Sequence, residues 1–281
     1  MEPHQKKKLI ISLVYLLIFS LFVGLLYYFF FYQVPTCIDG VQNGKEAGVD
    51  CGGICTNVCM EVVTGVPFTI EEVAIVPGGT DRYDVLGRIY NPNDTEGASM
   101  FTYTVTLKDS TGATLTTKKG TSYILPQERK TLIEVGLPST QVPATATLTV
   151  DDITWERFSG YQERPNINIY QKRYNQITSG VGFGEAFGLV SNESPFDFRS
   201  LTVKVILRDG SGKALAVNST EMRTITTGEE RDFRLVWPEA FPGGVEQVDM
   251  EVDADYYHAD NFLKQYLPGG RFQEVAPGGA R

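Results

Sequence analysis

The four cysteines of the chain have its most distinctive chemistry, and they occur in one short stretch: Cys37, Cys51, Cys55 and Cys59. An even, clustered set on the outer side of a membrane predicts two disulfides, because so small a segment cannot bury enough apolar surface to fold unaided. Four cysteines allow three pairings, and the sequence does not choose among them. Zinc bound by four thiolates is the alternative, but the spacing lacks the Cys-x2-Cys knuckles of common zinc modules.

Oxygen ligands lie between these cysteines. Asp39, Asn43, Glu46 and Asp50 alternate with glycines that permit tight turns, and calcium prefers carboxylate and amide oxygens. Their spacing is not that of an EF-hand loop. Asp and Asn also stabilise turns by hydrogen-bonding the local backbone, and we favour this second interpretation. Calcium is therefore a candidate ligand, and turn stabilisation is the competing role.

The same segment resembles a short cysteine motif of secreted and surface proteins, often found beside a membrane anchor or between domains. The matching residues are Cys37, Asp39, Gly40, Asn43, Gly44, Glu46, Gly48, Asp50, Cys51, Gly52, Gly53 and Cys55. The match covers only about 20 residues. The resemblance implies an extracellular, disulfide-bonded spacer without an activity of its own.

Side chains suited to catalysis are scarce. The chain has two histidines, His4 and His258, which restricts nucleophile–histidine and histidine-rich metal sites. Paired acidic residues occur at 151–152 and 229–230, but there the predicted strands end or turn, where acidic side chains are ordinarily solvated. We therefore predict that the protein is not an enzyme.

An apolar run at residues 9–32 determines where these groups are located. It contains no charge and would span roughly 36 Å as a helix at about 1.5 Å per residue, enough to cross a bilayer. Lys6, Lys7 and Lys8 precede it, and such residues keep a short N-terminal tail in the cytoplasm. The sequence predicts a single-pass membrane protein whose remaining chain is extracytoplasmic.

A cleaved signal peptide is the main alternative for this run. Signal peptides have an apolar stretch of about 7 to 15 residues that ends in small residues before the cut. This run ends instead in an aromatic cluster at residues 27–32, which suits the outer membrane interface. We predict an uncleaved anchor, ahead of a signal peptide and of a type IV pilin-like start.

The charge of the predicted extracytoplasmic part is strongly negative. The chain has 25 basic and 34 acidic residues; without Lys6, Lys7, Lys8 and Glu2, 22 and 33 remain, a net charge of -11. An acidic surface argues against nucleic acid and anionic lipid as partners.

The chain after Met60 has short alternating strands separated by Gly, Pro, Asn and Asp, the pattern of sandwiches and small barrels. The same order of features occurs twice, about 100 residues apart, which indicates duplication of a whole domain. The corresponding residues are Asn91 and Asn192, 103–112 and 203–212, 125–129 and 226–230, and 145–150 and 245–252. Lys108 and Arg208 alternate outward from the buried face, so we expect both to be solvated.

We predict an all-β fold, two tandem immunoglobulin-like β-sandwich domains behind one N-terminal transmembrane helix and a small disulfide-stapled segment. The expected parts are a cytoplasmic tail at 1–8, the transmembrane helix at 9–32, a cysteine-rich spacer at 35–60, sandwich domains at 61–155 and 160–255, and a C-terminal tail at 256–281.

The repeats resemble the FxLYD-type β-sandwich of envelope proteins. The resemblance rests on three features of each repeat: an Asn before a turn, a strand with the pattern apolar-x-apolar-x-Leu-x-Asp-x-x-Gly, and a later turn that contains Glu. It covers about 60 residues in each repeat. Lys108 and Arg208 stand in place of the tyrosine in that family's name. The resemblance implies an extracytoplasmic module with an accessory or interaction role and no catalytic residues.

Two functional classes follow from these features. The first is a structural or protein-interaction component of a cell envelope, bound to the lipid bilayer and to another envelope protein. The second is a ligand-binding ectodomain of a sensory or transport assembly, which would bind calcium, sugar or peptide. For sugar or peptide the candidate residues are Trp155, Tyr161, Trp237 and the tyrosines near the C-terminus.

Overall fold

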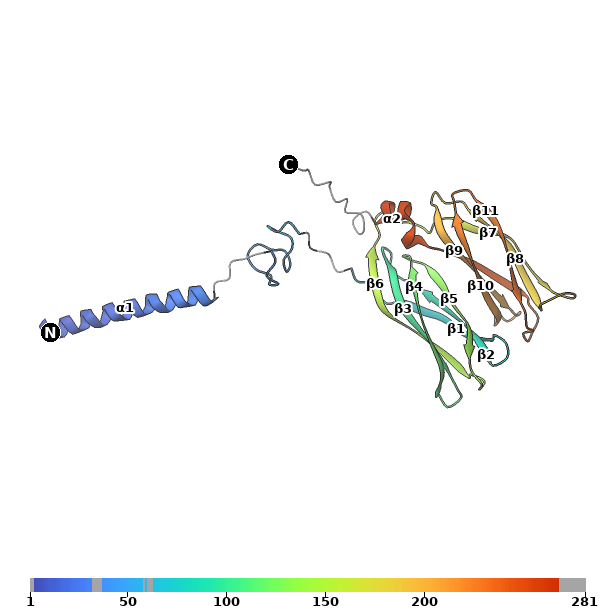
Figure 1. Ribbon diagram of the computed structural model, residues 1–281, viewed down its shortest axis with the longest axis horizontal. Coiled ribbons are helices and arrows are strands. Elements are labelled where there is room, and N and C mark those ends of the chain that lie inside the picture. Colours follow the sequence, from blue (N-terminus) through green and yellow to red (C-terminus); the bar gives the residue numbers. More distant parts are fainter. Residues whose placement is uncertain (1–2, 32–36, 58, 60–62, 268–281) are drawn as a thin grey trace. The chain divides into compact units, whose positions relative to one another are not determined.

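The computed structural model describes residues 3–31, 37–57, 59 and 63–267. The chain divides into two compact units, Met1–Val62 and Val63–Arg281. The first contains the apolar helix and the cysteine segment, and the second contains all twelve strands of the described chain (Figure 1).

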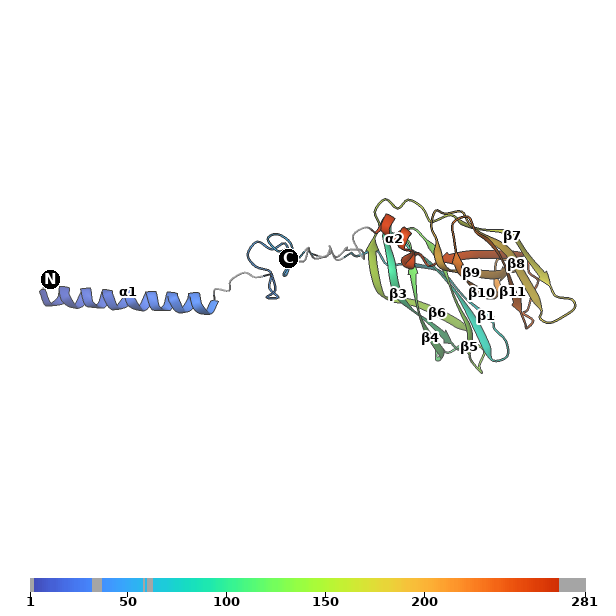
Figure 2. The same cartoon turned by 45° about the horizontal axis from the view of Figure 1, so that its top comes forward.

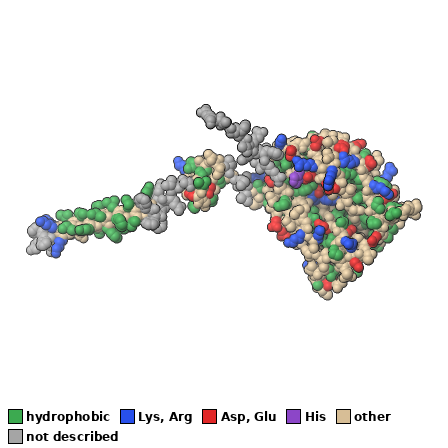
Figure 3. Space-filling view, in the orientation of Figure 1, with side chains coloured by type: hydrophobic (Ala, Val, Ile, Leu, Met, Phe, Trp, Pro, Cys, Tyr) green, Lys and Arg blue, Asp and Glu red, His purple; other side chains and the backbone are tan. Residues whose placement is uncertain are grey.

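Helix α1, Pro3–Phe31, forms from the apolar run. Its segment Lys6–Tyr28 has a mean hydropathy of 2.8 and is long and apolar enough to cross a membrane. None of the side chains in that window is buried within the protein, and Figure 3 shows hydrophobic side chains along its length. A helix that is apolar all round needs an apolar environment from outside the chain. A membrane span and a signal sequence both meet this description.

The cysteine segment has little regular structure apart from an isolated bridge between Gly48 and Cys51. Its disulfides join Cys37 to Cys55 and Cys51 to Cys59. The two disulfides close overlapping loops, which restricts the unfolded chain in a segment with no apolar core.

The first half of the second unit is a sandwich of two three-stranded antiparallel sheets. One sheet has the order β1-β2-β5 and the other β4-β3-β6. The strands are β1 (Thr69–Pro77), β2 (Arg82–Tyr90), β3 (Glu96–Lys108), β4 (Thr114–Ile124), β5 (Arg129–Pro138) and β6 (Thr145–Arg157). Their inward side chains form one buried apolar cluster.

The second half repeats this arrangement strand for strand. Its sheets have the orders β7-β8-β11 and β10-β9-β12. The strands are β7 (Ile167–Gln176), β8 (Gly184–Asn192), β9 (Phe198–Arg208), β10 (Ala214–Ile225), β11 (Glu230–Trp237) and β12 (Gln247–Ala254). The identical strand order supports the duplication predicted from the sequence.

The hairpin turns of the two copies use the same chemistry. Asp109 Oδ1 accepts the N–H groups of Thr111 and Ala113 at 2.8 and 2.9 Å, and Asp209 does the same for the equivalent residues of its own copy. The hydroxyl groups of Thr111 and Ser211 also donate to these aspartates. This hydroxyl hydrogen bond has the largest effect on the pKa of each aspartate, and together with the backbone hydrogen bonds it lowers that pKa. Gly112 follows with φ +86°, a conformation that favours glycine.

A buried asparagine connects two loops in each copy. The Asn91 side chain is 0% exposed, and its Nδ2 donates to the carbonyls of Glu96 and Leu125 at 2.8 and 2.9 Å. Asn192 is equally buried and donates to the carbonyls of Phe196 and Thr226. One short amide therefore satisfies backbone groups of two loops that lie far apart in sequence.

The chain beyond β12 is folded, in contrast to the tail expected from residue 256. A short 3-10 helix, η1 (Tyr256–His258), is followed by α2 (Asp260–Tyr266), and four of their large side chains are buried: Tyr256, Tyr257, Phe262 and Leu263. The Tyr257 hydroxyl donates to the Ile124 carbonyl in the first sandwich at 3.1 Å. The aromatic residues after β12 complete the core instead of extending from it, and residues 268–281 lie outside the described part.

We expect Asn91→Ala and Asn192→Ala each to lower the free energy of unfolding by about 3 kcal/mol, because two buried carbonyls lose their donor. Denaturant unfolding of the full-length chain in detergent is the measurement. Exposed Asn175 serves as the control, and its change to Ala should cost no more than about 0.5 kcal/mol. Equal losses in all three variants would contradict the role given to the buried amides.

Candidate functional site

The acidic side chains of the cysteine segment hold its turns together. Asp50 Oδ1 and Oδ2 accept the backbone N–H groups of Asp39 and Gly40 at 2.9 and 2.8 Å. Asn43 Nδ2 donates to Asp39 Oδ2 at 3.0 Å, and the Asn43 N–H donates to Glu46 Oε2 at 3.2 Å. The four residues proposed as calcium ligands therefore all take part in local hydrogen bonds, as the turn interpretation requires.

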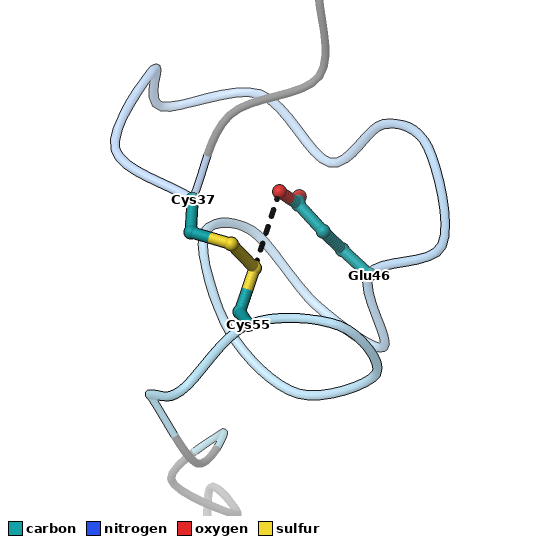
Figure 4. Close-up of side chains that lie close together, drawn as sticks. All are labelled: Cys37, Glu46 and Cys55. Carbon is teal, nitrogen blue, oxygen red and sulfur yellow. Dashed lines mark hydrogen bonds between the residues drawn. A yellow bond between two sulfur atoms is a disulfide. The ribbon is translucent and has the colours of Figure 1, made fainter.

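Glu46 lies beside the Cys37–Cys55 disulfide (Figure 4). Its Oε1 is 3.5 Å from Cys55 Sγ. A disulfide sulfur has no hydrogen to donate, so this is a contact and not a true hydrogen bond. All four cysteines are paired, which removes the thiolates that the zinc alternative needs.

Calcium has partial support from the geometry. Asp50 has committed both oxygens to backbone donors, and Glu46 is turned toward the disulfide. Asn43 Oδ1, however, is buried and without a hydrogen-bond partner. Turn stabilisation accounts for the carboxylates, whereas that one amide oxygen keeps calcium as a hypothesis.

We expect a calcium chelator to leave the melting temperature of the full-length chain unchanged, because the carboxylate oxygens already accept backbone hydrogens. The measurement is thermal unfolding in detergent with added calcium and with excess chelator. A reproducible rise of several degrees with calcium would instead show that the chain binds calcium and would keep Asp39, Asn43, Glu46 and Asp50 as candidate ligands.

A second candidate site, not predicted from the sequence, lies where the two sandwiches meet. The sheet β1-β2-β5 of the first packs against the sheet β10-β9-β12 of the second, side by side in Figures 1 and 2. An apolar cluster from both sheets is buried between them: Val76, Leu86, Ile206, Ala214 and Val217. We call this contact the junction.

A buried charged triad lies at the junction. The ammonium groups of Lys130 on β5 and Lys204 on β9 are 2.6 and 2.9 Å from the Asp253 carboxylate on β12. The three side chains are only 2%, 10% and 11% exposed. Lys204 Nζ also donates to the Thr131 carbonyl at 2.5 Å, and Lys130 Nζ lies 3.6 Å from the centre of the Tyr123 ring. The triad therefore binds strands of both sandwiches through one carboxylate.

Burial and charge act in opposite directions on these groups. Burial alone raises the pKa of Asp253, but the two ammonium groups outweigh it and hold that pKa well below its usual value. Burial lowers the pKa of Lys130, and the nearby carboxylates offset this only in part. Asp253 is thus an ionised carboxylate that pairs with Lys204 of its own sandwich and with Lys130 of the other, and the second pair exists only while the two sandwiches stay together.

Further ion pairs extend the junction. Arg208 Nη1 and Nη2 are 2.8 and 2.9 Å from the two oxygens of Glu72 on β1, and its Nε is 2.7 Å from Asp249. Arg88 Nη2 is 3.0 Å from Glu251 on β12. The expectation that Arg208 is solvated was wrong: its side chain is 8% exposed, because the first sandwich covers the face of β9 that would otherwise meet water.

The aromatic residues proposed for ligand binding have structural roles. Trp237 is 6% exposed and its Nε1 donates to a backbone carbonyl of β10 at 3.1 Å. Trp155 packs edge-on against Phe68, and Tyr161 against Phe158, with ring centres 5.2 and 5.3 Å apart. Trp155 packs against the core of the first sandwich, whereas Tyr161 and Trp237 belong to the core of the second, so the three do not form one sugar- or peptide-binding surface.

The acidic pairs considered for catalysis have ordinary surroundings. Asp151 and Asp152 are exposed on β6. Glu229 accepts the Thr226 N–H at 2.9 Å within a turn, and this hydrogen bond is the largest cause of its lowered pKa. Solvation and turn formation account for both pairs.

These observations define the class of protein: an all-β chain of four small antiparallel sheets, with an apolar N-terminal helix and two disulfides between them in sequence. No family model matches the chain, and no curated protein matches it. Among solved structures, a transglutaminase from red sea bream is similar at 14% identity with a TM-score of 0.21. The likeness covers 69% of this chain and 29% of the transglutaminase, and at that score it carries no information on activity.

We expect Asp253→Asn to lower the free energy of unfolding by about 3 to 5 kcal/mol at neutral pH, since two buried ammonium groups lose their counter-charge. Denaturant unfolding of the full-length chain in detergent measures it. The control is Asp249→Asn, which is partly exposed and leaves Arg208 paired with Glu72; its cost should stay below about 1 kcal/mol.

Acid should remove the same contribution from the unsubstituted chain. A folded pKa below the unfolded value of about 3.9 means that the stabilisation is present above that pH and is lost as pH falls further. The Asn variant should lack this part of the acid dependence. A variant with unchanged stability and an unchanged acid profile would refute the role of Asp253.

Proposed function

We propose that this chain is a membrane-anchored, extracytoplasmic structural or protein-interaction component of a cell envelope, and not an enzyme. The single observation that supports it best is the junction. Two sandwiches joined by buried charge and apolar packing form one compact unit, which suits the display of fixed surfaces to another protein.

Anchoring accounts for the N-terminal helix. The apolar segment Lys6–Tyr28 is not buried against any of the described residues, and the lysines at its start favour a cytoplasmic N-terminus. Disulfides in the segment that follows fit an oxidising exterior. In this arrangement the cysteine segment is a spacer between the membrane and the sandwiches.

An interaction role also agrees with the FxLYD-type resemblance of the repeats, which brings no catalytic residues. The ion pairs among Lys130, Lys204 and Asp253 and between Arg208 and Glu72 serve cohesion of the two sandwiches. The acidic charge of the chain beyond the helix favours a protein partner over nucleic acid. We propose another envelope protein as that partner.

Protease treatment of intact cells that express the chain tests the topology. With an N-terminal epitope and one after residue 281, protease should remove the C-terminal epitope and spare the N-terminal one, in a membrane-bound product that still begins at Met1. Release of a soluble product without its N-terminus would show a signal peptide, and protection of the sandwiches would refute the orientation.

Crosslinking in the same cells tests the interaction role. We expect a lysine-reactive crosslinker to yield a discrete heteromeric product, identifiable by mass spectrometry, that is absent when the chain is not expressed. Recovery of the monomer alone would refute the interaction role and leave the topology result standing.

A further inference from the structure

A pocket of about 250 Å³ opens at the junction beside the turn between β1 and β2. The first sandwich contributes residues 77–79, Asp84 and residues 135–136. The second contributes residues 217–218 and 237–241. Because neither sandwich alone provides all of its walls, the pocket exists only while the junction holds them together.

Asp84 is the buried charge of this pocket. Its side chain is 9% exposed, and Oδ1 accepts the Gly136 N–H at 2.7 Å. Oδ2 has no hydrogen-bond or ion-pair partner among the described residues. Burial raises the pKa of Asp84, and the hydrogen bond from Gly136 offsets this only in part. An aspartate so placed lacks a counter-charge within the part of the chain that the structure describes.

A second carboxylate comes from the other sandwich. Glu239 is exposed, and its oxygens lie over Gly79, where an added Cβ would be 3.0 Å from each of them. A Cβ on neighbouring Gly78 would be 2.4 Å from Asp84 Oδ1. Because Gly78 and Gly79 have no side chains, the carboxylates of Asp84 and Glu239 can both approach this short stretch of backbone.

No described lysine or arginine forms an ion pair with either carboxylate. Arg82 is close in sequence, but its Nη1 donates to the Gly136 carbonyl at 3.3 Å.

Comparison of the two sandwiches shows that the lack of a cationic partner is specific to Asp84. Glu185 occupies the position equivalent to Asp84, counted back from the buried asparagine of each repeat, and Arg234 binds it at 2.6 Å. Asparagine at position 84 would serve the Gly136 N–H equally well without burying a charge. The hydrogen bond from Gly136 therefore accounts for an oxygen acceptor at position 84 but not for a negative charge there.

The remaining walls decide what kind of cation fits. Pro77, Val217, Trp237 and Phe241 supply the apolar part of the lining. Calcium takes six to eight oxygen ligands, more than two carboxylates provide. A short alkyl chain ending in a positive group matches both the lining and the charge, and the small volume excludes drug-sized molecules.

We propose that the junction pocket binds a primary alkylammonium group, with Asp84 as its buried counter-ion and Glu239 as a second carboxylate at the entrance. The alkyl chain lies along the apolar lining. Such a group occurs on free amines and on lysine side chains. The proposal does not depend on the membrane topology or on the partner protein.

The chain's two tryptophans make the test direct, since Trp237 lines the pocket and Trp155 does not. In full-length protein with 15N-labelled tryptophan in detergent micelles, titration with n-butylammonium should shift the Trp237 indole signal saturably and leave that of Trp155 in place. n-Butanol, which has the same chain without the charge, should produce no saturable shift. An unmoved Trp237 signal, or an equal response to n-butanol, would overturn the proposal.

Variants identify the carboxylates. Asp84→Asn keeps an acceptor for Gly136 and should weaken n-butylammonium binding about 10- to 100-fold, as expected for loss of a buried charged hydrogen bond. Exposed Glu239→Gln, which poses little risk to folding, should weaken it several-fold. The control Glu185→Gln removes an acid outside the pocket and should leave the affinity unchanged. Equal affinity in all three variants would overturn the assignment.

Two further ligands define the source of the ammonium group. Tighter binding of Nα-acetyl-lysine N-methylamide than of n-butylammonium would support a lysine side chain of a polypeptide. Binding of n-butylammonium but not of the lysine derivative would support a small free amine. Saturable displacement of n-butylammonium by millimolar calcium would overturn the proposal in favour of an inorganic cation.

Discussion

Asp253 is a carboxylate at the boundary between two sheets, and two ammonium groups replace the water around it. Removing an ion from water costs several kcal/mol, and this cost is offset only where the partners are held at hydrogen-bonding distance. Lys130 comes from the first sandwich, and Lys204 comes from the second, as Asp253 does. Separation of the sandwiches would break the contact between Lys130 and Asp253 and leave only the Lys204 pair, so the triad favours one relative position of the two.

Several other features depend on that position. Arg208 can reach Glu72 only because the sheet that contains β9 lies against the sheet that contains β1. Tyr257, after the last strand, donates to a carbonyl at the end of β4 and thereby connects the C-terminal segment to the first sandwich. The acidic pocket at the turn between β1 and β2 also has walls from both halves. The contact between the two sandwiches thus both holds them together and forms the pocket.

The repeated turns and strands could be predicted because their causes are local. Asp109 and Asp209 hydrogen-bond residues two and four positions ahead, and the alternation in β3 buries Phe101, Tyr103, Val105 and Leu107 on one face. The disulfide pairing could not be predicted, because Cys51 and Cys55 are each close in sequence to more than one partner. Only the path of the turns decides which sulfur atoms meet.

The sequence by itself determined an apolar helix, a cysteine segment and a duplicated all-β pattern, because side-chain periodicity and turn residues act over short distances. The tertiary structure decided which outward-facing side chains of the strands are exposed and which are covered by the other sandwich. Thr104 and Lys204 occupy equivalent strand positions, yet Thr104 is half-buried on an outer sheet whereas the Lys204 side chain is buried beneath the other sandwich. Ile206 between Val205 and Leu207 was the one local sign that both faces of β9 are covered. Which surface covers them depends on contacts between residues more than 100 positions apart, such as Lys130 and Asp253, and no local pattern records those.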